Sequence, residues 1–369
     1  MIQRILIEKR TMHFREPFKI AYETVTEAEV VVLALVDELG NTGLGSAAPD
    51  EEVTGENNDA IYKAVKARLS PDFFSIPFED LPSYSKKIRE LFPRLPSAQA
   101  MVETALLHLS AKRQKHAPQE FFGKFRESVK IVVTIGIKSL PETVNEVDRR
   151  IKEGFETIKL KCGLDPESDI KKILAVRKAM PSSTRLLLDA NQGYSFKQAE
   201  TVLRAVSHLG IAGMEQPVKA SHKEELKKLT DLKLISIIAD EAAITAEEAR
   251  FLLSRDYADG INIKLMKFGG PFASKEIIEL ALKKSKLVML GCMYESNASI
   301  TAAAYLALAY PVDFVDLDSG HLDFDDDPSL FGAVVKNGNL KIKGIPEWKE
   351  LAAVSSPSSF RPKESARKT

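Results

Sequence analysis

From residue 129 onward, short apolar runs alternate with longer stretches that carry apolar residues at helical spacing. Eight runs predict β-strands, and they are VKIVVTIGI (129–137), TIKLK (157–161), RLLLD (185–189), IAGME (211–215), LISIIAD (234–240), GINIKL (260–265), KLVML (286–290) and VDFVDLD (312–318). The stretches between them, such as residues 165–180 and 195–210, have the period of amphipathic helices. Strands that alternate with helices run parallel, and eight of them favour a closed barrel.

The pattern before residue 129 is of the α+β kind. Residues 4–14 and 29–49 predict strands, with turns at GNTG (40–43) and GLGS (43–46), and residues 57–117 have helical spacing. We therefore divide the chain into four parts. They are an α+β capping domain (1–125), a barrel (126–321), a C-terminal segment that packs back on the capping domain (322–350), and a polar tail expected to be disordered (351–369).

Composition and charge narrow the class of protein. Lys plus Arg and Asp plus Glu both number 52, so the net charge gives no electrostatic case for a nucleic acid or membrane partner. Two cysteines in distant segments, Cys162 and Cys292, fit a reducing compartment better than a disulfide scaffold. The N-terminus lacks the apolar core of a signal peptide, and no run approaches the ~18 apolar residues of a membrane span. We expect a soluble cytoplasmic protein.

Three acidic residues end consecutive predicted strands. Asp189, Glu215 and Asp240 follow one another at one βα unit each, so their side chains should converge at the C-terminal rim of the barrel. An all-oxygen set of carboxylates suits Mg²⁺, and Asn191 could support it. Each acid could instead cap a helix, but Glu is a poor N-cap. Three in succession therefore favour a metal site.

Lysines flank these acids. Lys159 and Lys161 share one face of their strand, because side chains alternate, and the opposite face is wholly apolar. Lys264 ends a later strand, one unit past Asp240, and should point into the barrel mouth across the ring from Lys161. A solvated surface position is the alternative for such lysines, and we expect it for Lys267, which lies in the loop after the strand.

Two lysines on opposite sides of a metal-bound carboxylate suit proton transfer at the α-carbon. One lysine removes the proton, the metal stabilises the enediolate, and the other lysine protonates the opposite face. An ordinary lysine with a pKa of ~10.4 is a poor base. We expect Mg²⁺ and a neighbouring cation to lower that pKa. Lys159 would do this for Lys161 and would help to hold the substrate carboxylate. The reaction is racemisation or epimerisation.

At these spacings, five short motifs resemble the enolase superfamily, in its muconate-lactonizing-enzyme subgroup. They are KLK (159–161), LDANQG (188–193), MEQP (214–217), ADE (239–241) and NIKLMKFGG (262–270). The resemblance covers residues 1 to 350. It implies an α/β fold, a modified (β/α)7β TIM-type barrel with an α+β capping domain, and one Mg²⁺ per subunit. Barrel proteins of this kind are often homo-oligomers, although the sequence marks no interface.

The last predicted strand carries Asp316 and Asp318 on one face. This Asp-x-Asp resembles the one in dipeptide epimerases, where it binds the free α-ammonium of the substrate while the C-terminal carboxylate meets Mg²⁺. The alternative is a pair of acids that cap a turn. Two acids argue against dianionic, muconate-like substrates, and acylated amino acids have no free ammonium to satisfy them.

The resemblance also suggests residues that contact the substrate side chains. In the segment PFKIAYETVTEAE (17–29), Ala-Glu epimerases often carry an arginine, whereas this chain has Tyr22 and Glu23. Neither pairs with a carboxylate, so a small, hydrophobic or cationic second residue fits better than glutamate. Thr134, Met293 and Ser296 are further candidates for substrate binding.

Four functions stay open on these residues. The first is a Mg²⁺-dependent dipeptide epimerase with a dipeptide as its small-molecule partner. The second is a related N-acylamino acid racemase or cycloisomerase. The third, from a different class, is a Schiff-base barrel aldolase that uses one lysine and no metal. A non-catalytic binding protein is the fourth, and it leaves the acids and lysines without a reason to converge.

Overall fold

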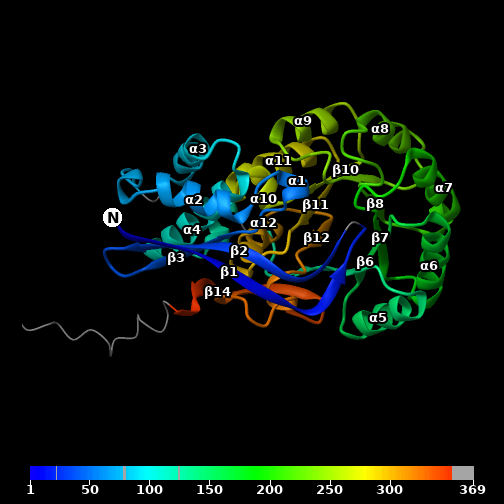
Figure 1. Cartoon of the computed structure of the whole chain (residues 1–369), viewed down its shortest axis with the longest axis horizontal. Helices are drawn as coiled ribbons and strands as arrows, with labels where there is room; N and C mark the ends of the chain where they lie inside the picture. Colours follow the sequence, from blue (N-terminus) through cyan, green and yellow to red (C-terminus); the bar gives the residue numbers. More distant parts are fainter. Residues whose placement is uncertain (22, 78–79, 124, 351–369) are drawn as a thin grey trace, which may run out of the picture.

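Within residues 1–21, 23–77, 80–123 and 125–350, which this computed structural model describes, eight parallel strands form a curved central sheet (Figure 1). They are β5 (Val132–Ile135), β6 (Thr157–Lys161), β7 (Arg185–Asp189), β8 (Gly213–Glu215), β9 (Ile237–Ala239), β10 (Gly260–Ile263), β11 (Leu287–Gly291) and β12 (Phe314–Asp316). Each pairs with its neighbour in sequence. The two ends of the sheet meet where the backbone N–H of Thr134 donates to Asp318 at 2.6 Å. Every predicted barrel strand is present, and the predicted fold class is confirmed.

Helices cover the outside of this barrel. They are α5 (Leu140–Lys152), α6 (Pro166–Ala179), α7 (Phe196–Val206), α8 (Lys223–Asp231), α9 (Ala246–Ser254), α10 (Leu265–Phe268), α11 (Pro271–Lys283) and α12 (Asn297–Ala309), with 3₁₀ turns η3 (Ser207–Leu209) and η4 (Gly320–Leu322). Local sequence sets where several of them begin. Ser139 with Glu142, and Ser195 with Gln198, form capping boxes that satisfy the first free N–H groups of α5 and α7.

An apolar floor closes the lower part of the barrel. It consists of Val132, Leu187, Ile238, Met289 and Phe314, which form a buried cluster separate from the main core. Because side chains alternate along a strand, the residue two positions after an inward-facing one also faces inward. Polar side chains at the strand ends therefore lie above an apolar floor, in the position where barrel enzymes carry their chemistry.

The N-terminal part forms a three-stranded antiparallel sheet with helices beside it. Its elements are β1 (Ile2–Lys19), β2 (Thr24–Asp37), β3 (Thr42–Ala47), α1 (Glu51–Thr54), α2 (Asn58–Arg68), η1 (Pro71–Phe73), α3 (Leu81–Leu91), α4 (Pro96–Gln114) and η2 (Pro118–Phe122). The hairpin of β1 and β2 extends toward the barrel (Figure 1).

The turn predicted at GLGS is wrong, because these residues lie in β3. A Cβ on Gly43 would lie 2.0 Å from the carbonyl oxygen of Ala105, and one on Gly45 would lie 2.0 Å from that of Met101. The glycines therefore allow the backbone of α4 to pack directly on the strand. Close approach, rather than a turn, explains their presence.

The segment predicted to pack back on the capping domain forms β13 (Ser329–Lys336) and β14 (Asn339–Trp348), which pair with each other, and β14 also pairs with β4 (Val129–Lys130). Glu347 of β14 accepts a hydrogen bond from Lys112 of α4 at 2.8 Å. Phe324 forms an isolated bridge with Phe14 of β1. The polar tail at 351–369, for which we predicted disorder, lies outside the described residues.

Helix α4 joins the two parts of the molecule through a buried carboxyl group. Glu103 accepts a hydrogen bond from the backbone N–H of Phe272, in the first turn of α11, at 2.6 Å. Burial raises the pKa of Glu103 to about 7. A carboxyl group with a raised pKa in the folded state stabilises the fold at low pH and loses that contribution as pH rises toward 7.

We therefore expect Glu103→Gln, which cannot lose a proton, to be more stable than the wild type at pH 8, by on the order of 2 kcal/mol, and not at pH 4. Urea denaturation at the two pH values measures this. Glu90→Gln, at an exposed position on α3, serves as the control and should change stability little at either pH. An equal effect of Glu103→Gln at both pH values would contradict the expectation.

Candidate active site

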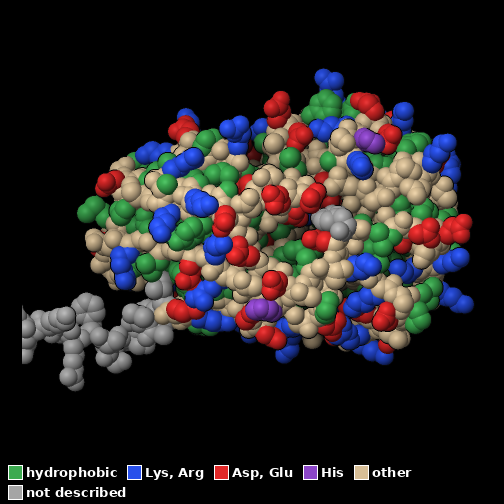
Figure 2. All heavy atoms as spheres, viewed as in Figure 1, with side chains coloured by type: hydrophobic (Ala, Val, Ile, Leu, Met, Phe, Trp, Pro, Cys, Tyr) green, Lys and Arg blue, Asp and Glu red, His purple; other side chains and the backbone are tan. Residues whose placement is uncertain are grey.

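The carboxyl ends of the barrel strands open into a cavity of about 410 Å³. Capping-domain residues of β1 and its following loop, among them Phe14, Phe18 and Ile20, line one side. The barrel contributes Thr134, Lys159, Lys161, Asn191, Lys264, Met293, Asp316 and Asp318, all of which the sequence pattern indicated. Figure 2 shows acidic side chains gathered around a hollow in this face of the molecule.

The three predicted metal ligands lie beneath this cavity on neighbouring strands. Asp189 and Glu215 are register partners on β7 and β8, and Asp240 follows the end of β9. Each of the three is only 1% exposed. Burial, followed by the charge of Asp189, raises the pKa of Glu215 well above its usual range, although Lys159 opposes the shift. The carboxylates therefore act on one another, as groups in one small volume do.

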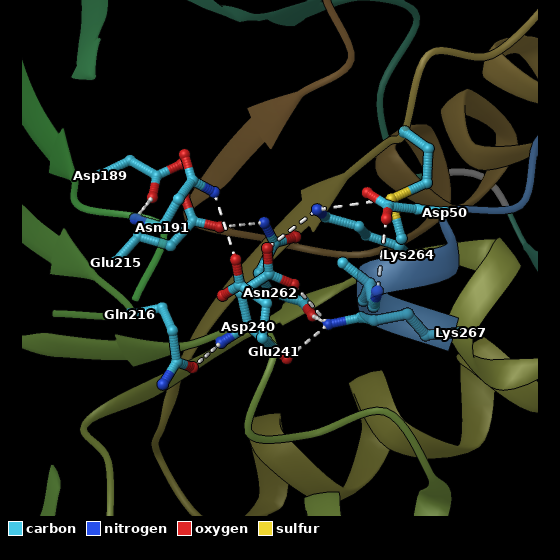
Figure 3. A network of polar contacts seen from close by, with 12 residues as sticks. Asp50, Asp189, Asn191, Glu215, Gln216, Asp240, Glu241, Asn262, Lys264 and Lys267 are labelled. Atoms are coloured by element: carbon cyan, nitrogen blue, oxygen red, sulfur yellow. Dashed lines mark hydrogen bonds and ion pairs between the residues drawn. The ribbon is translucent and has the colours of Figure 1, made fainter. Parts of the chain in front are cut away.

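The lysines predicted to face the acids pair with them. Lys161 donates to Asp189 at 2.7 Å and to Asn191 at 2.7 Å. Lys264 forms an ion pair with Asp240 at 2.8 Å. In Figure 3, Lys264 lies on one side of Asp240, and Asn191 lies with Asp189 and Glu215 on the other. The two proposed bases therefore lie on separate strands, β6 and the end of β10, with the acid-bearing strands between them.

Lys159 lines the cavity and lies among the acids. Its ammonium group lies 3.3 Å from Glu215 and 3.6 Å from Asp189, and it also pairs with Asp316. Burial alone would lower the pKa of Lys159, but the charge of Asp316 and then those of Glu215 and Asp189 raise it well above its usual value. Lys159 therefore supplies the central positive charge of the cluster.

The same acids also determine the pKa of Lys264. Burial favours the neutral form, but Asp240 and then Glu215 outweigh it and raise the pKa of Lys264 well above its ordinary value. The lowering that we expected does not arise from the charges of the protein itself. A divalent cation on the same carboxylates would offset their charge and so favour a neutral lysine.

The carboxylates of the site are paired with lysines, which bears on whether they fit a metal ion. Among the described residues, no three or more His, Cys, Asp or Glu side chains stand in an arrangement that could hold one. The carboxylate oxygens pair with lysines instead, so an ion would take oxygens that ammonium groups now contact. The donor set is nevertheless suitable, since three buried, mutually repelling carboxylates need more positive charge and offer the oxygen atoms that Mg²⁺ prefers.

The Asp-x-Asp pair lies at the edge of the cavity, on either side of the buried Leu317. The backbone N–H of Thr134 donates to Asp318 at 2.6 Å, and its hydroxyl donates to Asp316 at 3.4 Å. Thr134 therefore holds the two acids together. Asp318 is half-buried and faces the cavity, whereas Asp316 also pairs with Lys159.

The residues predicted to contact substrate side chains lie in different places in the structure. Glu23 is half-buried and accepts a hydrogen bond from Tyr294 at 3.4 Å, whereas Tyr22 lies outside the described residues. Met293 lines the cavity, with its sulfur 3.8 Å from the Lys264 ammonium. Ser296 is a correction, because it does not line the cavity. Its hydroxyl lies 2.5 Å from that of Ser46 on β3, where it joins the two domains.

Lys267 is a second correction. We expected a solvated side chain, but it is completely buried and donates to Asp240 at 2.6 Å. The short helix α10 turns it back under the strand ends. Its neighbours Met266 and Phe268 are buried too. A lysine in a loop of apolar residues, as in LMKFGG, was the signal that could have indicated burial.

Sequence reasoning also missed several acids that line the cavity, among them Asp50 and Glu241. Asp50 caps α1 by accepting from the backbone N–H of Glu52 at 3.0 Å, and an N-cap pattern alone does not indicate a cavity residue. Glu241 accepts from the side-chain amide of Asn191 at 3.2 Å. Burial, followed by the charge of Asp240, raises the pKa of Glu241 to about 7. Its place directly after Asp240 was the available signal.

Two protein-family models and several curated relatives match this chain. The model of the family described as "Enolase C-terminal domain-like" matches residues 142–346, and that of the "Mandelate racemase / muconate lactonizing enzyme, N-terminal domain" matches residues 1–123. The L-Ala-D/L-Glu epimerase of Clostridium acetobutylicum is 34% identical over 94% of this chain and 97% of its own length.

Two solved structures are similar along nearly the whole chain. A substrate-liganded complex of the L-Ala-D/L-Glu epimerase from Bacillus subtilis has a TM-score of 0.88 at 32% identity, covering 94% of this chain and 97% of the other. A dipeptide epimerase from Methylococcus capsulatus, complexed with Mg and the dipeptide L-Arg-D-Lys, has a TM-score of 0.85 at 29% identity, covering 94% and 98%. In the described part of this chain, no helix has the length and apolar character needed to cross a membrane.

Proposed function

This chain belongs to the enolase superfamily, in the mandelate racemase and muconate lactonizing enzyme group, and from that membership we propose that it is a Mg²⁺-dependent dipeptide epimerase. One observation carries the proposal. Two lysines, the buried Lys161 and the half-buried Lys264, enter the same cavity from strands on either side of a carboxylate cluster. Two opposed amines are what inversion at a carbon centre requires, because one face loses a proton and the other gains one.

The reaction is a 1,1-proton transfer at the α-carbon of the C-terminal residue. One lysine, in its neutral form, takes the α-proton, and the electron pair of the broken C–H bond moves into the carboxylate to give an enediolate. The other lysine, protonated, returns a proton to the opposite face. When held by Asp189, Glu215 and Asp240, Mg²⁺ supplies positive charge beside the substrate carboxylate.

Other residues of the chain would hold the substrate and the bases. Asn191 accepts from Lys161 at 2.7 Å and so fixes its ammonium group. Asp318, and Asp316 beside it, would bind the free α-ammonium of the dipeptide, since opposite charges pair strongly in a buried site. Lys159 would help to hold the C-terminal carboxylate. A dipeptide with a free N-terminus fits this arrangement better than an acylated amino acid does.

The charges around the cavity bear on the second residue of the dipeptide. Of the described residues, the arginines that line the cavity are already paired, Arg15 with Asp325 and both Arg149 and Arg150 with Glu146. The capping loop offers Glu23 instead of an arginine. We therefore propose a small, hydrophobic or cationic second residue rather than glutamate. The Methylococcus capsulatus enzyme, solved with L-Arg-D-Lys, is a relative with a cationic dipeptide.

Incubation with a dipeptide library in D₂O, followed by mass spectrometry, tests reaction type and substrate together. We expect Mg²⁺-dependent incorporation of one deuterium into dipeptides with a free N-terminus, and none after EDTA treatment. Exchange of N-acetylated amino acids instead would favour an N-acylamino acid racemase. Covalent trapping of substrate by borohydride would favour a Schiff-base aldolase, and exchange without Mg²⁺ would refute the metal-dependent proposal.

A further inference from the structure

Lys267 is a buried charged residue beside the site that the proposed reaction does not use. Its side chain is 0% exposed. The ammonium group donates to the Asp240 carboxylate at 2.6 Å, to the Asp240 carbonyl at 2.9 Å and to the Asn262 carbonyl at 2.8 Å. Its three N–H groups thus each have an acceptor. A fully buried lysine is rare unless its partners compensate the loss of water, so this set of contacts requires an explanation.

These contacts lie where the backbone ladder between two strands has stopped. β9 and β10 pair at Gly260 with Ile238 and at Ile261 with Ala239, and the pairing ends there. Asp240 and Asn262 are the next residue on each strand. Lys267 bridges their carbonyl groups, as Figure 3 shows, and so ties the two strand ends together beyond the last backbone hydrogen bond.

The Asp240 carboxylate is held in one orientation by the same contact. Lys267 engages its Oδ1, whereas the other oxygen, Oδ2, lies 2.8 Å from Lys264. On the opposite side, the Gln216 side-chain oxygen accepts from the backbone N–H of Asp240 at 3.0 Å. Asp240 is thus fixed through its N–H, its carbonyl and one carboxylate oxygen, and only Oδ2 remains directed at the base.

We propose that Lys267 is a positioning residue that fixes both Asp240 and the strand end that carries Lys264. This inference rests on the proposed function, in which Asp240 is a ligand of Mg²⁺ and Lys264 transfers a proton to or from the substrate. Lys267 itself does not line the cavity, so it acts through these two residues and not on the substrate. Outer partners that orient a metal ligand typically change metal affinity by 10- to 100-fold when they are removed.

Lys267→Met keeps the length of the side chain and removes all three donors, and Lys267→Gln keeps an amide donor without the charge. We expect Mg²⁺ to bind to Lys267→Met about 10- to 100-fold more weakly than to the wild type, by isothermal titration calorimetry without substrate. Lys172→Met is the matched control, since Lys172 is a buried lysine on α6, outside the site. Its Mg²⁺ affinity should equal that of the wild type.

A second readout separates positioning from a general loss of structure. Lys267 holds the strand end that precedes Lys264, so its loss should disturb Lys264 more than Lys161. In Lys267→Met, deuterium exchange of the epimer that Lys264 deprotonates should therefore fall about tenfold more than exchange of the epimer that Lys161 deprotonates. Equal falls for both epimers, with wild-type Mg²⁺ affinity, would overturn the proposal.

The other outcomes of these measurements also support or refute the positioning role of Lys267. If Lys267→Met does not fold by circular dichroism, Lys267→Gln takes its place, and failure of both to fold would assign Lys267 to folding and overturn the positioning role. If the wild type and Lys172→Met bind no Mg²⁺, the proposed function itself fails and this inference with it. Wild-type binding with unchanged binding to the Lys267 variants refutes only the inference.

Discussion

Replacing either Lys161 or Lys264 with alanine is expected to abolish epimerisation, with kcat/KM lower by about 10³-fold or more. In the proposed mechanism each lysine serves one face of the α-carbon, because the two lysines enter the cavity from different strands. Loss of one base therefore stops inversion even though the other base, the acids and the cavity remain. The assay is chiral separation of the product dipeptide.

Each of these two variants should still exchange the α-proton of one epimer with solvent. With one lysine left, one epimer can still lose its α-proton and regain deuterium on the same face, so exchange without inversion should persist for that epimer only. The two variants should retain exchange for opposite epimers. Lys152→Ala, at a lysine whose side chain is 74% exposed, is the control and should epimerise normally. Full turnover by Lys161→Ala or Lys264→Ala would refute the two-base assignment.

Glu215→Gln should remove Mg²⁺ dependence along with activity. Glu215 lies between the strands that carry Asp189 and Asp240, so its loss takes the central carboxylate from the proposed metal site. We expect kcat/KM to fall by about 10³-fold, because metal-derived charge stabilisation is worth several kcal/mol. Without metal, the variant should be as stable as the wild type. Burial and the charge of Asp189 already favour a neutral group at this position.

Thermal unfolding with and without Mg²⁺ measures this second effect directly. An ion at 100 times its Kd stabilises the folded state by about 2.7 kcal/mol, and the wild type should show the corresponding rise in Tm. Glu215→Gln should show none. Glu167→Gln, at an exposed position on α6, should respond as the wild type does. A Mg²⁺-induced rise in Glu215→Gln equal to that of the wild type would place the ion elsewhere.

The sequence alone was enough to predict the barrel and to place lysines and carboxylates at the ends of its strands, although it did not indicate Asp50 or Lys267 as part of the site. Alternation along a strand is a local property, and so the shared face of Lys159 and Lys161 follows from counting residues. The regular spacing of βα units then places Asp189, Glu215 and Asp240 on adjacent strands, because sequential strands in such a fold are neighbours. Both inferences need only the period of the pattern.

Only the tertiary structure decided what lies against these residues. Ser296 packs on Ser46, 250 positions away, and the glycines of β3 meet the backbone of α4. Lys267 turns under the strand ends through α10 and pairs with Asp240. The pKa of Lys264 likewise depends on carboxylates that other strands bring close. The period of a sequence determines which way a side chain points, but its burial, charge and partners depend on distant segments that only folding brings together.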